Sequence, residues 1–189
     1  SHFIRVSEEE LHTANQQLTQ LAIRDTLTNL LNRREMERLL KEAVALSQAQ
    51  KTPLSVILMD IDHFKAVNDN YGHDMGDKVL LTVSDAISRT IRGSDAGCRW
   101  GGDEFFIILQ GAPLAVAGRV GERIRRRVEE AKMPFSHNVT ISVGAAAFDP
   151  EQDNELQLFK NADEALYQAK KAGRNVVYAL GFGRVSSEE

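Results

Sequence analysis

The sequence predicts an α+β domain with a mostly antiparallel sheet. Three observations lead to this fold class. Strand-like and helix-like segments alternate irregularly along the chain, a hairpin pattern lies near its middle at 96–109, and residues 54–62 form the nearly continuous apolar run of a central strand. A doubly wound parallel sheet would require a regular alternation of single strands and helices.

Length and charge limit the possible functions. The chain has 189 residues, which suits one domain with a short appendage. With 23 Lys+Arg against 27 Asp+Glu, its net charge of −4 gives no general attraction for nucleic acid or an anionic membrane. Any phosphate that the protein handles must therefore be met by local charges or by a metal.

The cysteine content and the absence of long apolar runs indicate a cytoplasmic location. Cys98 is the only cysteine, so it cannot form an internal disulfide or build a zinc site by itself. No apolar run approaches the ~20 residues of a membrane span, and the first residues are not a signal peptide. Because the sequence begins with Ser1, we expect a longer parent protein, which could include a sensor or a membrane anchor.

The first 21 residues read as a helix with heptad spacing. Ile4, Leu11 and Leu18 lie seven residues apart, and Ala14 and Leu21 fill the alternate positions. Two interpretations stay open. The segment is either an amphipathic helix packed on its own domain or the end of a dimerising coiled coil.

A structured connection at 24–34 leads to the next helix. Asn32 can cap that helix, with Glu35 at capping-box spacing, and the helix ends before residues 51–53. The strand at 54–62 follows, covered on both faces or on one face and an end. A short helix from Phe64 is broken at 70–72, and a longer helix runs from about 74 to 92.

The second half of the chain begins with the hairpin, in which 96–100 pair with 104–109. Pro113 opens a helix, and 139–145 alternate as a half-buried strand. A helix at 155–172 ends at Gly173, a short strand covers 175–180, and we expect 181–189 to fray. The expected inward residues of the helix at 155–172 are Leu156, Phe159, Ala162, Leu166 and Ala169.

Two carboxylates end the central strand. Asp60 and Asp62 share one face of it, and Ile61 offers only its carbonyl to that site. Acids after an apolar strand are costly unless they are paired or bind a cation, and Mg²⁺ prefers such oxygen ligands. Alternatively, Asp62 caps the helix that begins near Phe64.

Two more acids, Asp103 and Glu104, lie at the hairpin tip. They either occupy a solvated turn or, if the hairpin pairs beside the strand of Asp60, converge with it so that a divalent cation relieves their repulsion. Gly101 and Gly102 leave room for a triphosphate near the backbone.

Two further groups have both a local and a functional interpretation. Lys170 and Arg174 follow a helix C-terminus, where the helix dipole already favours basic residues, but they could hold terminal phosphates. Asn68 and Asp77 are either helix-end caps or an amide and a carboxylate that recognise the edge of guanine.

These segments together resemble the GGDEF family of diguanylate cyclases. Residues 99–105, RWGGDEF, look like its signature, and residues 25–34 are similar to its opening D-x-L-T-G-L-x-N-R-R. Residues 60–77 resemble its metal and guanine segment, and 162–175 its closing helix. The resemblance covers roughly residues 22–180, preceded by a linker or signalling helix at 1–21.

The resemblance implies a ferredoxin-like fold, similar to the palm of nucleotidyl cyclases and polymerases. It also implies that two GTP are condensed to cyclic di-GMP with release of two pyrophosphates, using Mg²⁺ or Mn²⁺. Each domain of the family has one nucleotide half-site, so a homodimer is the active form.

Site residues follow from the family pattern. The implied metal ligands are Asp60, the Ile61 carbonyl, Asp103 and Glu104. The implied catalytic residues are Asp103, Glu104 and Lys65. The implied substrate contacts are Asn68 and Asp77 for guanine, His63, Phe64, Lys65, Lys170 and Arg174 for phosphates, and His73.

A product-inhibition site is also implied. Arg92 and Asp95 match the family's R-x-x-D motif five residues before the Gly-Gly pair, and Arg123 is a second contact for bound cyclic di-GMP. The alternative is an ordinary helix end with an Arg–Asp pair.

Departures from the family pattern are few. Asn29 replaces a usual Gly but tolerates the same left-handed backbone, and Trp100 replaces Tyr or Phe. Asp77, where relatives making a mixed product have Ser, predicts the symmetric product. Other functions are a catalytically silent GGDEF module that binds GTP or cyclic di-GMP, or a pure dimerisation module, but all acids and glycines of the signature are present.

Overall fold

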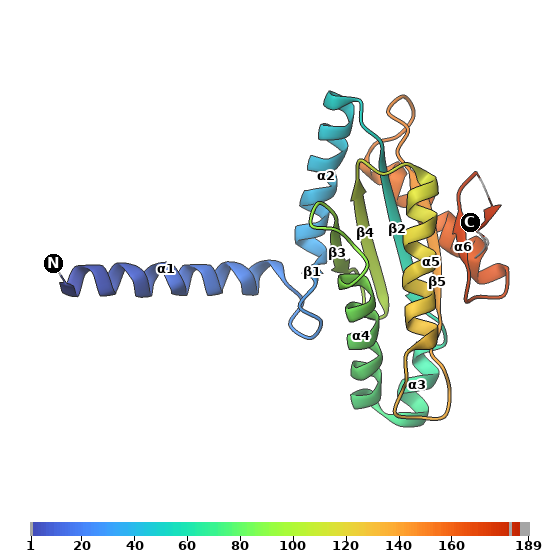
Figure 1. Cartoon of the computed structure of the whole chain (residues 1–189), viewed down its shortest axis with the longest axis horizontal. Helices are drawn as coiled ribbons and strands as arrows, with labels where there is room; N and C mark the ends of the chain where they lie inside the picture. Colours follow the sequence, from blue (N-terminus) through green and yellow to red (C-terminus); the bar gives the residue numbers. More distant parts are fainter. Residues whose placement is uncertain (1, 182, 186–189) are drawn as a thin grey trace.

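The computed structural model describes residues 2–181 and 183–185, and within them the side chains of 9–19 and of 22 onward (Figure 1). In chain order the described elements are α1 (His2–Ile23), β1 (Leu31–Asn32), α2 (Arg33–Gln50), β2 (Leu54–Ile61), α3 (Phe64–Tyr71), α4 (His73–Ser88), β3 (Ala96–Arg99), β4 (Glu104–Gln110), α5 (Leu114–Glu130), β5 (Ile141–Ala147), α6 (Glu155–Lys171), β6 (Val177–Ala179) and β7 (Gly183–Arg184).

One mixed sheet connects all the described strands, in the order β1-β3-β4-β2-β5-β6-β7. Its centre is antiparallel, because β2 pairs with β4 on one side and with β5 on the other. Only β1 with β3 and β5 with β6 are parallel among the described pairs. The predicted α+β class with a mostly antiparallel sheet is confirmed.

Helices cover both faces of the sheet. Ile57 and Met59 of β2 point to the core formed with α4 and α5, whereas Val56 and Leu58 point to the core formed with α2 and α6. β2 is therefore buried on both faces, as its apolar run predicts.

The prediction of a half-buried strand at 139–145 is wrong. In β5 the six residues from 141 to 146 are all buried. Gly144 and Ala146 face α6, whereas Ala145 faces the core on the side of α4 and α5. A Cβ on Gly144 would lie 2.2 Å from the Leu166 nitrogen and 2.5 Å from the Ala162 oxygen, so glycine allows α6 to lie directly on the strand.

Three smaller predictions also need correction. Leu156 is 58% exposed, and Leu158 occupies the inward position at the start of α6. The helix expected to reach residue 92 ends at Ser88. In the tail, Gly183 and Arg184 do not fray but pair with β6, and Val185 packs against Gly118 of α5, whereas residues 182 and 186–189 lie outside the described part.

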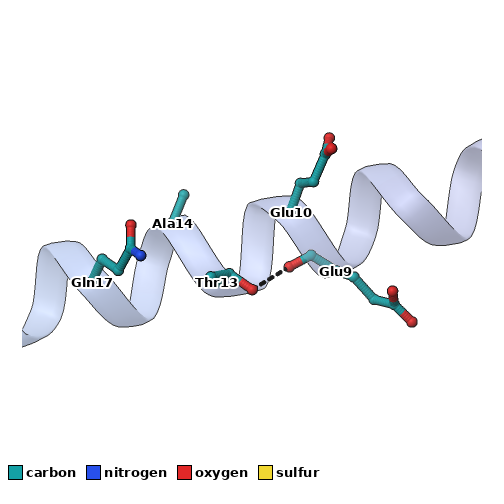
Figure 2. Close-up of a pocket in the computed structure, with 5 residues that line it drawn as sticks. All are labelled: Glu9, Glu10, Thr13, Ala14 and Gln17. Atoms are coloured by element: carbon teal, nitrogen blue, oxygen red, sulfur yellow. Dashed lines mark hydrogen bonds between the residues drawn. The ribbon is translucent and has the colours of Figure 1, made fainter.

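Helix α1 projects away from the domain (Figure 1). Leu11 and Leu18 are each 63% exposed, so the interpretation that this helix packs on its own domain is wrong for the described side chains, whereas Ile4 and Leu21 are not among those. A shallow hollow lies on α1, and Figure 2 shows the side chains that line it, with the Thr13 hydroxyl donating to the Glu9 carbonyl at 2.8 Å. All five residues that line it come from this one helix, namely Glu9, Glu10, Thr13, Ala14 and Gln17.

None of the helices formed by the described residues combines the length and the apolar character needed to cross a bilayer.

Candidate active site

The hairpin lies beside the strand of Asp60, as its proposed role requires. In the β2–β4 ladder Asp60 is directly opposite Glu104, and the Ile61 N–H donates to the Asp103 carbonyl at 3.1 Å. Because β4 begins at Glu104, the glycines at 101 and 102 and the acid at 103 form the tip next to the end of β2.

Asp60 is the most strongly perturbed acid of this site. Burial is the largest cause that raises its pKa to about 6, and nearby Asp103 adds to the increase while Lys170 opposes it. The Lys170 ammonium of α6 donates to Asp60 Oδ2, but the buried Asp60 Oδ1 has no hydrogen-bond partner among the described residues. Glu104 also has a raised pKa, from burial first and then from the charge of Asp60.

This donor set fits a hard divalent cation. An orphaned carboxylate oxygen, a neighbouring acid and a main-chain carbonyl are the ligands that Mg²⁺ accepts. Within the described residues, however, no three side chains from His, Cys, Asp or Glu are grouped so as to hold a metal ion. Asp60, Asp103 and Glu104 are therefore adjacent without forming a complete cage, and a cation here would need main-chain, water or phosphate oxygens as well.

Asp62 has a structural role that differs from the two roles the sequence predicts, a cation ligand or a helix cap. The residue is 7% exposed, and its carboxylate accepts from Ser142 Oγ at 2.6 Å and from Thr140 Oγ1 at 2.7 Å. It also accepts from the Asn175 N–H at 3.0 Å. It does not cap α3, because the N-cap position is His63, which makes no side-chain capping bond. Asp62 instead joins the end of β2 to β5 and to the turn after α6.

The turn between β2 and α3 presents the residues proposed to meet phosphate. His63 is left-handed, with φ 56°, and its carbonyl accepts the N–H groups of Ala66 and Val67. His63 and Lys65 are exposed, whereas Phe64 is half-buried and packs against the core.

The proposed guanine contacts lie on two adjoining helices. Asn68 is on α3, and its buried Oδ1 has no hydrogen-bond partner among the described residues, so its side chain is not a helix cap. A Cβ on Gly76 of α4 would lie 1.9 Å from this Oδ1, so glycine leaves the space that the amide occupies. His73 and Asp77 are exposed in the first turns of α4.

The second proposed phosphate site is the end of α6. Lys170 lies in the last helical turn, and Gly173 follows the C-cap residue Ala172 with φ 106°, which confirms its predicted place. Arg174 is exposed and also left-handed, with φ 66°.

A family model described as "Diguanylate cyclase, GGDEF domain" matches residues 22–176. The chain belongs to the GGDEF family. The curated relatives of this GGDEF domain include the response regulator PleD of Caulobacter vibrioides, 43% identical over 84% of the chain and 36% of PleD. The diguanylate cyclase DosC of Escherichia coli is 45% identical over 81% of the chain and 34% of DosC. The chain thus spans about a third of the length of these relatives.

Solved structures agree with this family. The coiled coil and GGDEF domain of DgcB from Caulobacter crescentus, in complex with c-di-GMP, has a TM-score of 0.87 at 31% identity, covering 93% of this chain and 94% of that one. The diguanylate cyclase SiaD of Pseudomonas aeruginosa, in complex with its activator SiaC, has a TM-score of 0.78 at 35% identity, covering 92% and 69%. These neighbours support the predicted fold, with helices packed around one mixed sheet.

The R-x-x-D segment of this GGDEF domain is a closed turn rather than a helix end. The Arg92 N–H donates to Asp95 Oδ2 at 2.8 Å, and the Asp95 N–H donates to the Arg92 carbonyl at 3.0 Å. This geometry leaves the exposed Arg92 side chain outside the turn. Arg123 is exposed on α5, the helix next to α4.

Several polar residues that hold the site together could not be recognised from the sequence pattern. Thr140 and Ser142 of the β5 segment looked like solvent-facing residues, but both donate to Asp62. Asn175 was placed in a short strand, whereas it is left-handed and bonds to Arg125 and Glu129 of α5. The signal available in the sequence is Asn directly after Gly-Arg, a residue that favours left-handed turns.

Proposed function

We propose that this GGDEF domain is an active diguanylate cyclase that condenses two GTP to cyclic di-GMP and two pyrophosphates. The observation that carries the proposal is the partly buried Asp60 carboxylate, whose buried Oδ1 has no partner among the described residues, paired in register with the intact hairpin at 101–104. The proposed setting is the cytoplasm, where GTP is available.

The proposed reaction is an in-line attack of a ribose 3′-oxygen on the α-phosphorus of a second GTP. Asp60, the Ile61 carbonyl and Asp103, with Glu104, would hold the Mg²⁺ or Mn²⁺, which supplies a lowered hydroxyl pKa and charge screening when bound. Asp103 or Glu104 would accept the hydroxyl proton.

Cationic side chains would stabilise the leaving pyrophosphate. Lys65 lies in the first turn of α3, Lys170 in the last turn of α6 and Arg174 in the turn that follows α6. Lys170 already bonds to Asp60 Oδ2, which leaves the unpartnered Oδ1 as the Asp60 oxygen that would hold a cation.

Base selection rests on Asn68 and Asp77. Asp77 would accept from the guanine N1–H and N2–H₂ groups, which adenine does not present in this pattern, so GTP is used and ATP is not. His73 lies close by on the same helix as Asp77.

Two domains must face each other, because one domain supplies one half-site. The active form is therefore a homodimer. Product inhibition would act through Arg92, Asp95 and Arg123. The exposed guanidinium groups of Arg92 and Arg123 suit bidentate contacts with phosphate and guanine. Bound cyclic di-GMP could hold the half-sites apart.

Product analysis of the purified chain with GTP and Mg²⁺ tests the catalytic proposal. We expect cyclic di-GMP from GTP, none from ATP, and turnover that falls by more than about 10²-fold in Asp60→Ala, because a charged group that stabilises the transition state is lost. A folded wild-type chain that binds GTP without converting it, at any concentration, would show a silent module instead.

The inhibitory site has a separate test. Arg92→Ala should keep uninhibited turnover within a few-fold of wild type while losing inhibition by added cyclic di-GMP, as measured by calorimetry and initial rates. Equal inhibition of the two proteins would show that residues 92–95 are only a turn.

A further inference from the structure

The turn after α6 has an unusual backbone. Gly173, Arg174 and Asn175 are three consecutive residues with positive φ, at 106°, 66° and 48°. Glycine and asparagine adopt this region readily, but arginine rarely does. A non-glycine residue stays in such a conformation only where its surroundings hold it there.

The first restraint on this turn comes from the end of the metal-site strand. The Asn175 N–H donates to Asp62 Oδ2 at 3.0 Å, and the same carboxylate is fixed by Thr140 and Ser142 of the β5 segment. This bond secures the backbone after Arg174 but leaves the Asn175 side chain free to act elsewhere.

The second restraint comes from α5, on the other face of the sheet from α6. Asn175 Oδ1 accepts from Arg125 Nη1 at 2.6 Å, and Asn175 Nδ2 donates to Glu129 Oε1 at 2.7 Å. Arg125 is itself held by both carboxylate oxygens of Glu122, at 2.8 and 2.9 Å, and by Glu129 at 2.7 Å. We call Arg125, Glu129 and the Asn175 amide the α5 clamp.

The α5 clamp is electrostatically matched and sheltered at Arg125. The Arg125 side chain is 11% exposed, whereas that of Glu129 is 38% exposed. The hydrogen bond from Asn175 is the largest cause that lowers the pKa of Glu129, followed by the bond from Arg125. An amide that satisfies both a cation and an anion cannot be replaced by a residue with only a donor or only an acceptor.

The clamp fixes the residues on either side of it. Arg174, directly before Asn175, has its N–H bonded to the Ala169 carbonyl of α6, and Lys170 lies one helical turn earlier. Both side chains are the proposed phosphate contacts. Their separation and direction therefore depend on how the turn leaves α6.

We propose that Asn175 is a positioning residue for triphosphate binding, which holds the turn through the α5 clamp so that Arg174 faces the β- and γ-phosphates. This inference rests on the proposed function, because it uses the proposed role of Arg174. It adds that α5, which makes no proposed contact with GTP, determines the affinity for its phosphates.

Binding to the full 189-residue chain tests this inference without turnover. The probes are 3′-deoxy-GTP, which lacks the attacking hydroxyl, and 3′-deoxy-GMP, which lacks the β- and γ-phosphates, each with Mg²⁺. Asn175→Gly keeps the left-handed backbone but removes the clamp. We expect about a tenfold or larger loss of affinity for 3′-deoxy-GTP, the size of a lost hydrogen bond to a charged group, and a change under about twofold for 3′-deoxy-GMP.

A double-mutant cycle shows whether Asn175 acts through Arg174. In an Arg174→Ala background, Asn175→Gly should have no further effect on affinity for 3′-deoxy-GTP. The matched control is Asn29→Gly, at another left-handed asparagine, with φ 58°, which should bind like wild type. Thermal unfolding identifies any variant that is not folded, and Asn175→Asp, which keeps only the acceptor for Arg125, then serves as the second variant.

The two proposals fail differently. If wild type binds 3′-deoxy-GTP and Asn175→Gly binds it equally well, the positioning role is overturned while the proposed function stands. Equal losses for both nucleotides, or full losses in the Arg174→Ala background, also overturn it, because they indicate a general structural effect. Failure of wild type to bind 3′-deoxy-GTP overturns the proposed function and this inference with it.

Discussion

At the scale of single residues, the site depends on groups that are held by one or two specific bonds. The Arg99 guanidinium donates to the Gly102 carbonyl at 2.8 Å and to Asp25 at 3.4 Å, so it connects the catalytic hairpin to the start of the domain. Burial opposes ionisation of Asp25, but hydrogen bonds from Thr28 and the charge of Arg99 lower its pKa below the usual value.

This lowered pKa predicts a pH-dependent effect of Asp25→Asn. A carboxyl with a depressed folded-state pKa adds stability above its unfolded pKa of about 4, and that stability is lost as pH falls through the lower folded value. Asp25→Asn should therefore destabilise the chain by about 1 kcal/mol at pH 7, with the difference shrinking below about pH 4. Urea unfolding of wild type and Asp25→Asn, at pH 7 and below about pH 4, measures the difference in their free energy of unfolding. A difference that does not change with pH would contradict the role of the charge.

Gly76→Ala tests the placement of Asn68. The new Cβ would lie 1.9 Å from Asn68 Oδ1, which is the end of a side chain and can move. We expect the fold to persist, since alanine favours a helix by about 1 kcal/mol over glycine, while affinity for GTP falls about tenfold or more. Gly118→Ala, a helical glycine that faces only Val185, is the matched control and should bind normally.

At the scale of elements, strong apolar periodicity made β2, the β3–β4 hairpin and α5 predictable, because each has its own local pattern. Two-residue strands have none: β1 and β7 exist because β3 and β6 offer partners. The sequence does not predict the full burial of β5, because Ser142 donates to Asp62 and Gly144 packs against α6, and both partners are distant in sequence. The acids of the site could be predicted from the sequence, whereas the α5 clamp on Asn175 could not, because its partners are also distant in sequence.

Gly144→Ala should disturb α6 as a unit. The added methyl would meet main-chain atoms of Leu166 and Ala162 rather than a movable side chain. We expect a loss of about 3 kcal/mol or more in the free energy of unfolding, the upper range for an overpacked core, together with weaker GTP binding because α6 carries Lys170. Gly93→Ala, which meets nothing within 4 Å, should change stability by less than about 0.5 kcal/mol. Equal stability of the two variants would show that α6 can shift freely.

At the scale of the whole molecule, α1 is the helix whose described apolar side chains do not pack against the domain. Leu11 and Leu18 lie seven residues apart on a helix that leaves the domain, and both are exposed. Two apolar side chains at heptad spacing become buried when a second helix packs against them. If the proposed function holds and each domain supplies one half-site, we expect α1 to supply the dimer contact.

The length of α1 sets the strength of that contact. Its 22 residues are about three heptads, and short coiled coils are marginal in water. The chain should therefore be mostly monomeric at micromolar concentration, with specific cyclase activity that rises with protein concentration by mass action.

The double variant Leu11→Ser with Leu18→Ser should need a higher protein concentration for the same increase in specific activity. GTP affinity per domain should stay unchanged, because neither residue is near the site. Sedimentation and initial rates over about a hundredfold dilution measure both, and activity independent of concentration would mean that the dimer forms through a surface other than α1 or that one domain suffices.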